Sequence, residues 1–378
     1  MSITASKRLN YIDFAKAISI ILIVCGHMLP SGCWPKTLMY AFHVPIFAFI
    51  GGLLFSAPRN MSASLKKLFG IFKRMLVPYL VWFAISVSLY WMETDGMASI
   101  VKGSATTDAV RLIKYFFFFE NATAWNDPLW FMPCYIFVMC LFLFFSLIAR
   151  GNRIASGVLS LLSFGTLIIL EKVGVVIKIA GVENAFGLNN YFLMLGFLAA
   201  GHTLRPVFDA CARVAENPRR RPILFSAFGV FALTAILCLM HNKVDTSAGY
   251  YTLSFYSGLY NGFVYYVSFA LLLSSSLLIA LMPLPRVRAM ELLSRNSLFI
   301  MFTHYFFFLD ESFSWLKSAD WGEFMNKHGL LYWQLDMSIG FRDGIFVCVF
   351  YVLLLLLVDA LIKRLPRAKG VLGIFGLQ

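Results

Sequence analysis

Charged residues are scarce in this chain. Only 13% of its 378 residues are Asp, Glu, Lys or Arg, whereas an average soluble domain carries about 25%. Hydrophobic residues make up 60% of the chain, and many stand in long apolar runs. Such runs are typical of helices that cross a membrane. The composition therefore excludes a soluble protein and predicts an all-α, polytopic integral membrane helix bundle that forms one domain over residues 1–378.

Several motifs of catalysis and ligand binding are also absent. The seven cysteines form no CxxC pair and show no Cys/His ligand spacing, so we interpret them as small hydrophobic residues rather than as disulfides or a metal site. The chain has no GxSxG motif, which would indicate a serine nucleophile. It also shows no internal repeat of the kind that builds the inverted halves of many transporters.

The apolar segments predict about ten transmembrane helices. Most basic residues lie at one set of helix ends and most acidic residues at the other, which by the positive-inside rule predicts that both termini are cytoplasmic. The net charge of +13 is then explained by orientation and by contact with lipid headgroups, and no nucleic-acid partner is expected. The predicted helices are 11–30, 37–56, 71–92, 128–148, 154–171, 188–205, 222–240, 258–282, 296–314 and 340–362.

Two ionisable residues stand inside the first apolar segment. Lys16 and His27 are eleven residues apart, which on a helix is about 20° past three full turns and a rise of roughly 16 Å. Asp13 precedes Lys16 by three residues and shares this face. Ionisable groups inside a membrane are costly and indicate function, and an imidazole can accept and return a proton near neutral pH. We therefore expect His27, Lys16 and Asp13 to be catalytic; the alternative is a buried histidine that only packs.

A basic cluster lies near the start of the third predicted helix, on the cytoplasmic side. Its two pairs are seven residues apart, so a helix would bring them to one face. Such a face suits phosphate groups, although anionic lipid is an equal alternative. The cluster comprises Lys66, Lys67, Lys73 and Arg74.

Three further residues are candidates for substrate binding. His43 lies near the outer end of the second predicted helix, and His304 is another histidine inside an apolar segment. Trp130, in the DPLWF segment, begins the fourth predicted helix on the outer side, where it would serve either in an aromatic belt or as a platform for a sugar.

These segments, in this order, resemble the acyltransferase 3 family of bacterial membrane acyltransferases, and most nearly its fucose 4-O-acetylase-like sugar O-acetyltransferases. The family pattern opens with a basic residue, ten residues and an essential histidine, which are Lys16 and His27 here, although Arg is commoner at the first position. FHVPIFAFIGGLLF, FKRMLVPYLVW, DPLWF and NSLFIMFTHY match later family segments, so the resemblance runs from residue 9 to about 308.

The resemblance implies an O-acetyltransferase of the bacterial inner membrane that modifies a surface polysaccharide. Acetyl-CoA would be the cosubstrate, with no permanently bound cofactor, and its phosphates would lie on the cytoplasmic basic cluster. His27 would act as a general base or carry the acyl group briefly, and a glycan or lipid-linked sugar would approach from outside, past Trp130 and His43. The residues alone leave open a proton-coupled transporter or exporter that uses His27, Lys16 and His304, and a membrane sensor or scaffold.

Overall fold

The computed structural model describes most of the chain, and helices dominate it. The described residues are 9–29, 31–93, 126–173, 178–179, 182–183, 188–244, 249–251, 253, 260–304, 332–364 and 368–377. In order, the elements are α1 (Asn10–Met28), α2 (Trp34–Phe42), α3 (Pro45–Leu54), α4 (Met61–Ile71), the π-helical η1 (Phe72–Leu76), α5 (Val77–Glu93), the 3₁₀ helix η2 (Asp127–Trp130), α8 (Phe131–Ile148), α9 (Arg153–Val173), β1 (Lys178–Ile179), β2 (Val182–Glu183), α10 (Leu188–Glu216), η4 (Arg221–Phe225), α11 (Ser226–His241), α12 (Phe263–Leu281), α13 (Arg288–Arg295), α14 (Ser297–Thr303), α17 (Tyr332–Arg364) and α18 (Ala368–Ile374).

The prediction of a polytopic helical membrane protein is confirmed. Within the described ranges, eight helical stretches are long and apolar enough to cross a membrane. They are Asn10–Met28, Trp34–Leu54, Met61–Ser86, Pro128–Ile148, Arg153–Leu170, Arg221–His241, Phe263–Leu281 and Gly344–Ile362. Large hydrophobic side chains such as Leu161 on α9, Leu233 on α11 and Leu353 on α17 are exposed, as expected of surfaces that face lipid.

Several of the ten predicted helices differ from the structure. The third begins ten residues early, at Met61, because Asn60 caps it by accepting a hydrogen bond from the backbone N–H of Ala63 at 2.9 Å. The sixth is helical, as α10, but is not among the eight apolar spans. Polar residues such as Asn190 and His202 lower its mean hydropathy, and they are buried in the bundle. Of the ninth, only residues 296–304 are described, and positions 305–314 lie outside the described residues.

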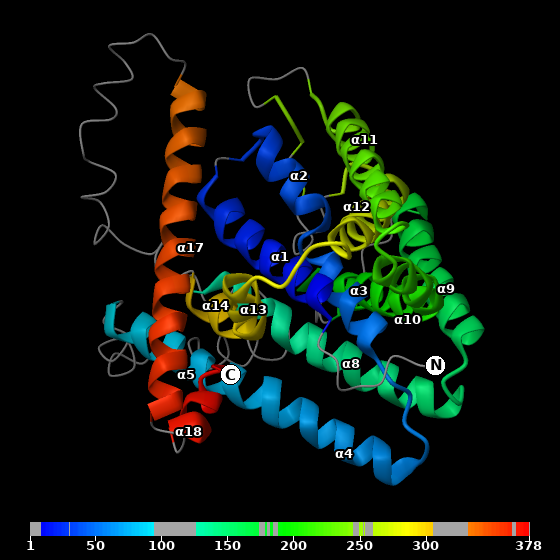
Figure 1. The fold of residues 1–378 in the computed structure, drawn as a ribbon, viewed down its shortest axis with the longest axis horizontal. Coiled ribbons are helices and arrows are strands. Elements are labelled where there is room, and N and C mark those ends of the chain that lie inside the picture. The colour runs from blue at the N-terminus through cyan, green and yellow to red at the C-terminus, as the bar shows by residue number, and fades with distance from the viewer. Residues whose placement is uncertain are drawn as a thin grey trace.

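The first helix lies in the interior of the bundle. It packs against α2, α3, α12, α13, α14 and α17, and most of its residues are buried (Figure 1). The connection from α1 to α2 lies at one end of the molecule, whereas α4 runs across the opposite end, near α18 (Figure 1). Because α1 is continuous from Asn10 to Met28, Lys16 and His27 lie on one helix, as predicted.

Two local features place the second histidine. The helix is interrupted between α2 and α3, at His43 and Val44, because Pro45 has no backbone N–H to continue the hydrogen bonding of α2. His43 therefore remains at the C-terminal cap of α2. Below this break, α3 packs closely on α10 because Gly52 has no side chain: a Cβ atom there would collide with the backbone of Leu198.

Candidate active site

Two histidines that are far apart in the sequence meet in the bundle. His27 is on the last turn of α1, and His304 follows α14 directly. Their ring centroids are 5.3 Å apart, and the rings are tilted by 47°. His304 is fully buried and His27 is half-buried. A reactive group beside His27 would therefore lie inside the protein, where proton transfer is shielded from bulk water.

Tyr40, on α2, connects this pair to the third histidine. Its ring centroid is 6.2 Å from that of His27 and 4.7 Å from that of His43. Tyr40 approaches α1 closely because residue 26 is glycine: a Cβ atom on Gly26 would lie only 2.8 Å from Cε2 of Tyr40. Tyr40 thus contacts both His27 and His43, and His27 in turn contacts His304.

Hydrogen bonds to the backbone define the protonated nitrogen in two of these rings. Nδ1 of His43 donates to the carbonyl oxygen of Met39 at 2.6 Å, and Nδ1 of His304 donates to that of Ile300 at 2.9 Å. A carbonyl oxygen can only accept, so Nδ1 carries the proton in each ring. In the neutral rings Nε2 is then the nitrogen that accepts a hydrogen bond or a proton.

A cation lies beside Tyr40. Nζ of Lys36 is 5.5 Å from the ring centroid of Tyr40 and donates a hydrogen bond to the carbonyl oxygen of Leu29 at 2.8 Å. Sequence analysis missed both Lys36 and Tyr40. The spacing of Tyr40 and His43, three residues apart, was the available signal, since such residues share one face of a helix.

The other two candidates on α1, the basic Lys16 and the acidic Asp13, lie farther from the histidines. At about 1.5 Å per residue, Lys16 is roughly 16 Å and Asp13 roughly 21 Å from His27 along the helix. Asp13 instead contacts α13, since its Oδ1 accepts a hydrogen bond from Oγ of Ser294 at 2.7 Å. Lys16 is half-buried. Neither residue can touch a group that reacts at His27, but both can contact the far part of a long substrate that reaches it.

The predicted phosphate cluster lies on α4 and η1, at the opposite end of the molecule from the α1–α2 connection (Figure 1). Lys66, Lys73 and Arg74 are exposed. Lys67 is not: its Nζ donates to the carbonyl oxygen and, at 2.7 Å, to Oγ of Ser56, and it lies 5.1 Å from the ring centroid of Phe55. The structure thus leaves three of the four side chains accessible from that side.

The segment of Trp130 lies next to α14. Trp130 ends η2, which packs against α14, and its ring is 6.0 Å from that of Phe131. Asn126, immediately before η2, reaches α14 directly, because its Nδ2 donates to the carbonyl oxygen of Phe302 at 2.8 Å. Asn126 was overlooked in the sequence, where only its position just before DPLWF could have drawn attention to it.

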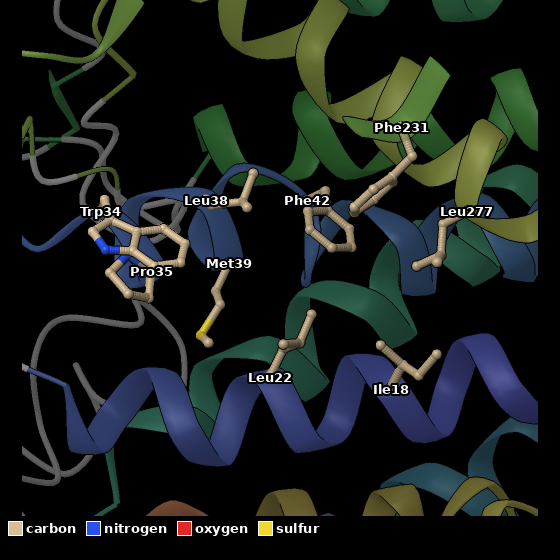
Figure 2. A pocket seen from close by; sticks show the side chains of 9 residues that line it. All are labelled: Ile18, Leu22, Trp34, Pro35, Leu38, Met39, Phe42, Phe231 and Leu277. Carbon is tan, nitrogen blue, oxygen red and sulfur yellow. The ribbon is translucent and has the colours of Figure 1, made fainter. Parts of the chain in front are cut away.

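An apolar cavity of about 310 Å³ adjoins the site (Figure 2). Leu22 of α1 and Met39 of α2 line it near the histidines, and Phe231 of α11 and Leu277 of α12 line its other end. Trp34 and Pro35 lie at the end nearest the α1–α2 connection (Figure 2). Its lining carries no titratable side chain, so acid–base chemistry does not take place within it.

Cys25 is two residues from His27 but does not pair with it. Cys25 lies in a small buried cluster against which Cys348, on α17, packs. All seven cysteines, each within the described ranges, are free thiols. Residues two apart on a helix point in different directions, so His27 does not activate Cys25 as a nucleophile.

Comparison with known proteins identifies the chemistry. A family model described as an acyltransferase domain, acyltransferase 3, matches residues 9–310, which is well over half of the chain. No curated protein and no solved structure matches the chain. The matched range includes the three histidines, Lys16, the basic cluster and Trp130. The chain is therefore a multi-pass membrane acyltransferase, and it belongs to the acyltransferase 3 family.

Proposed function

We propose that this enzyme is an O-acetyltransferase that moves an acetyl group from cytoplasmic acetyl-CoA to a hydroxyl group of a cell-surface glycan or lipid-linked sugar. The observation that carries the proposal is the pairing of His27 with His304 inside the bundle, at a ring distance of 5.3 Å. The proposal places the enzyme in the bacterial inner membrane as one domain over residues 1–378.

His27 is the general base of the proposed reaction. It takes the proton of the acceptor hydroxyl as the hydroxyl oxygen attacks the thioester carbonyl carbon. The C–S bond then breaks, the proton passes from His27 to the departing thiolate, and the products are an ester and free CoA. A transient acyl-histidine is the variant of this route in which His27 attacks first.

The other two histidines bind the acceptor. Nε2 of His304 is the accepting nitrogen of that ring and lies on the residue beside His27, so it suits a hydrogen bond from the acceptor hydroxyl. His43, which contacts Tyr40, lies on the path from the outer side. Trp130 supplies an aromatic face near α14 on which a sugar ring can stack.

The donor reaches the site from the cytoplasmic side. Lys66, Lys73 and Arg74 are exposed and can bind the phosphates of CoA through charge-assisted hydrogen bonds. The pantetheine arm then extends along α1, past Lys16, toward His27. Their separations from His27, about 16 Å for Lys16 and about 21 Å for Asp13, are why these residues contribute to donor binding and orientation rather than to proton transfer.

The proposal is tested with the purified protein and acetyl-CoA. We expect millimolar acetyl-CoA to raise the melting temperature, because a ligand that binds only the folded state stabilises it. We also expect slow release of free CoA, accelerated by a fitting acceptor. A matched sample with dephospho-CoA tests the phosphate contacts. The absence of both stabilisation and CoA release, together with full function of a His27→Ala variant in cells, would refute the proposal.

The acceptor is found in the producing cells. Deleting the gene is expected to lower the mass of one surface polysaccharide by one acetyl group per modified sugar, and the wild-type gene restores it. A mass change corresponding to succinyl or a longer acyl group would keep the acyltransferase but replace acetyl-CoA as its donor.

A further inference from the structure

Asn126 joins three segments beside the paired histidines. Its side chain is fully buried. Nδ2 donates to Oγ of Ser86, on α5, at 3.2 Å, and to the carbonyl oxygen of Phe302, on α14, at 2.8 Å. Asn126 itself directly precedes η2. One carboxamide therefore connects the start of η2, the third membrane-spanning stretch and the end of the helix that leads to His304.

The contact with Phe302 satisfies a helix end. The last four carbonyl groups of a helix lack partners within that helix, and inside a membrane protein water does not readily replace them. Phe302 belongs to the last turn of α14, which ends at Thr303. Asn126 supplies the missing donor. The turn that carries His304 is thus attached to η2 and α5 by a hydrogen bond from Asn126.

Two further hydrogen bonds hold the same turn. Oγ1 of Thr303 lies 2.6 Å from the hydroxyl oxygen of Tyr351, on α17. Nδ1 of His304 donates to the carbonyl oxygen of Ile300. The position of the His304 ring therefore depends on Asn126 on one side and on Tyr351 on the other.

We propose that Asn126 is a positioning residue that holds the end of α14 so that His304 faces His27. This inference rests on the proposed function, because it assigns Asn126 a role through His304. A displacement of a reacting group by about 1 Å can lower a rate by about 100-fold. Loss of the hydrogen bond from Asn126 to Phe302 should therefore lower turnover more than it weakens donor binding.

Asn126 could also act by contacting the substrate directly, and the oxygen of its carboxamide allows an experiment to separate that role from positioning. Among the residues that the structure describes, Oδ1 of Asn126 is buried and has no hydrogen-bond partner. A direct contact with substrate would use Oδ1 as an acceptor, whereas positioning of α14 uses Nδ2 as a donor. Variants that keep one function and remove the other separate the two.

The first experiment measures acetyl transfer by Asn126→Ala. We expect kcat to fall by about 10-fold to 100-fold, with KM for acetyl-CoA unchanged within about twofold. Asn242→Ala is the matched control, because Asn242 is equally buried and its Nδ2 donates to a helix carbonyl, that of Cys238, at 2.8 Å, on α11. The control is expected to lose stability but to keep its kcat. A kcat for Asn126→Ala no lower than that of the control overturns the inference.

The second experiment uses Asn126→Asp. A protonated Asp can donate one hydrogen bond to Phe302, whereas an ionised Asp can only accept. Because burial favours the protonated carboxyl group, we expect this variant to be active at low pH, relative to the wild type at the same pH, and to lose activity as the pH rises. Activity that rises with pH, relative to the wild type, would instead show that an accepting oxygen matters, and would refute positioning through Nδ2.

The third experiment tests whether the effect passes through His304. In a His304→Gln background, Asn126→Ala is expected to lower kcat no further, because the ring that it positions is gone. If the effects of Asn126→Ala and His304→Gln on kcat are fully additive, the inference is contradicted. If His304→Gln is too slow to assay, the pH dependence of Asn126→Asp tests the inference instead. The proposed function fails separately: it falls if the wild-type protein transfers no acetyl group, whereas the inference alone falls if the wild type transfers acetyl and the Asn126 variants do so equally well.

Discussion

The rings of His27 and His304 lie 5.3 Å apart, although more than half of the chain separates them in sequence. His27 is on the last turn of α1, His304 directly follows α14, and the two helices pack on each other. Each residue alone is a histidine inside an apolar segment. Together they form a pair that can bind a hydroxyl group and accept its proton, and the following predictions test what depends on this arrangement.

Replacing His27 by Ala is expected to lower acetyl transfer by at least about 100-fold, because general-base catalysis contributes roughly 10²–10⁴ to a rate. Acetyl release from acetyl-CoA by the purified variant measures the effect. His241→Gln is the matched control, since His241 also ends a membrane-spanning helix and its Nε2 lies 2.8 Å from the carbonyl oxygen of Asn261. Equal losses in both variants would indicate damage to folding rather than to catalysis.

Lys16 is expected to affect donor binding more than proton transfer. Lys16→Met should raise KM for acetyl-CoA with a smaller change in kcat, because Lys16 lies roughly 16 Å from His27 along α1. Lys16→Arg should retain most activity, since it keeps the charge and adds donors for phosphate or carbonyl groups. Steady-state kinetics on both variants checks this. A loss confined to kcat in Lys16→Met would contradict the assignment.

The exposed cations of α4 and η1 are expected to bind the donor electrostatically. Gln substitutions at Lys66 and Lys73 should each raise KM for acetyl-CoA by up to about fivefold, as expected of exposed charge pairs worth up to about 1 kcal/mol. Added salt should reduce the difference from wild type. Arg219→Gln and Arg220→Gln, exposed residues of another loop, serve as controls. Unchanged KM in the α4 variants would assign these cations to lipid instead.

Gly26→Ala is expected to disturb the site without removing any functional group. The added Cβ would lie 2.8 Å from Cε2 of Tyr40, so the ring, which contacts His27, must shift away from residue 26. We expect a stability loss of about 1–3 kcal/mol, as for other overpacked sites, and a lower kcat. Gly229→Ala, on α11, is the control because nothing lies within 4 Å of its added Cβ. Thermal unfolding and turnover, measured together, test the prediction; a wild-type kcat in Gly26→Ala would show that Tyr40 has no part in catalysis.

Much of the architecture was predictable because its signals are local. Apolar length and helical period located α1, α8 and α12, and the one-helix placement of Lys16 and His27 followed from the same period. α10 was harder to predict from hydropathy, because other helices surround it. Its buried residues can therefore be polar, as His202 and Asn190 are, and they lower its hydropathy. The start of the third stretch depended on the Asn60 cap rather than on the apolar run that follows it.

The sequence by itself determined that this protein is a helical membrane bundle, that His27 and Lys16 lie on one helix, and which family its ordered segments resemble. These properties depend on hydropathy and on neighbours within a few turns. Only the tertiary structure decided that His304 meets His27, that Tyr40 lies between His27 and His43, that Lys67 contacts Ser56, and that Asn126 holds the end of α14. Those contacts join distant segments, and they depend on how whole helices pack, which no local pattern encodes.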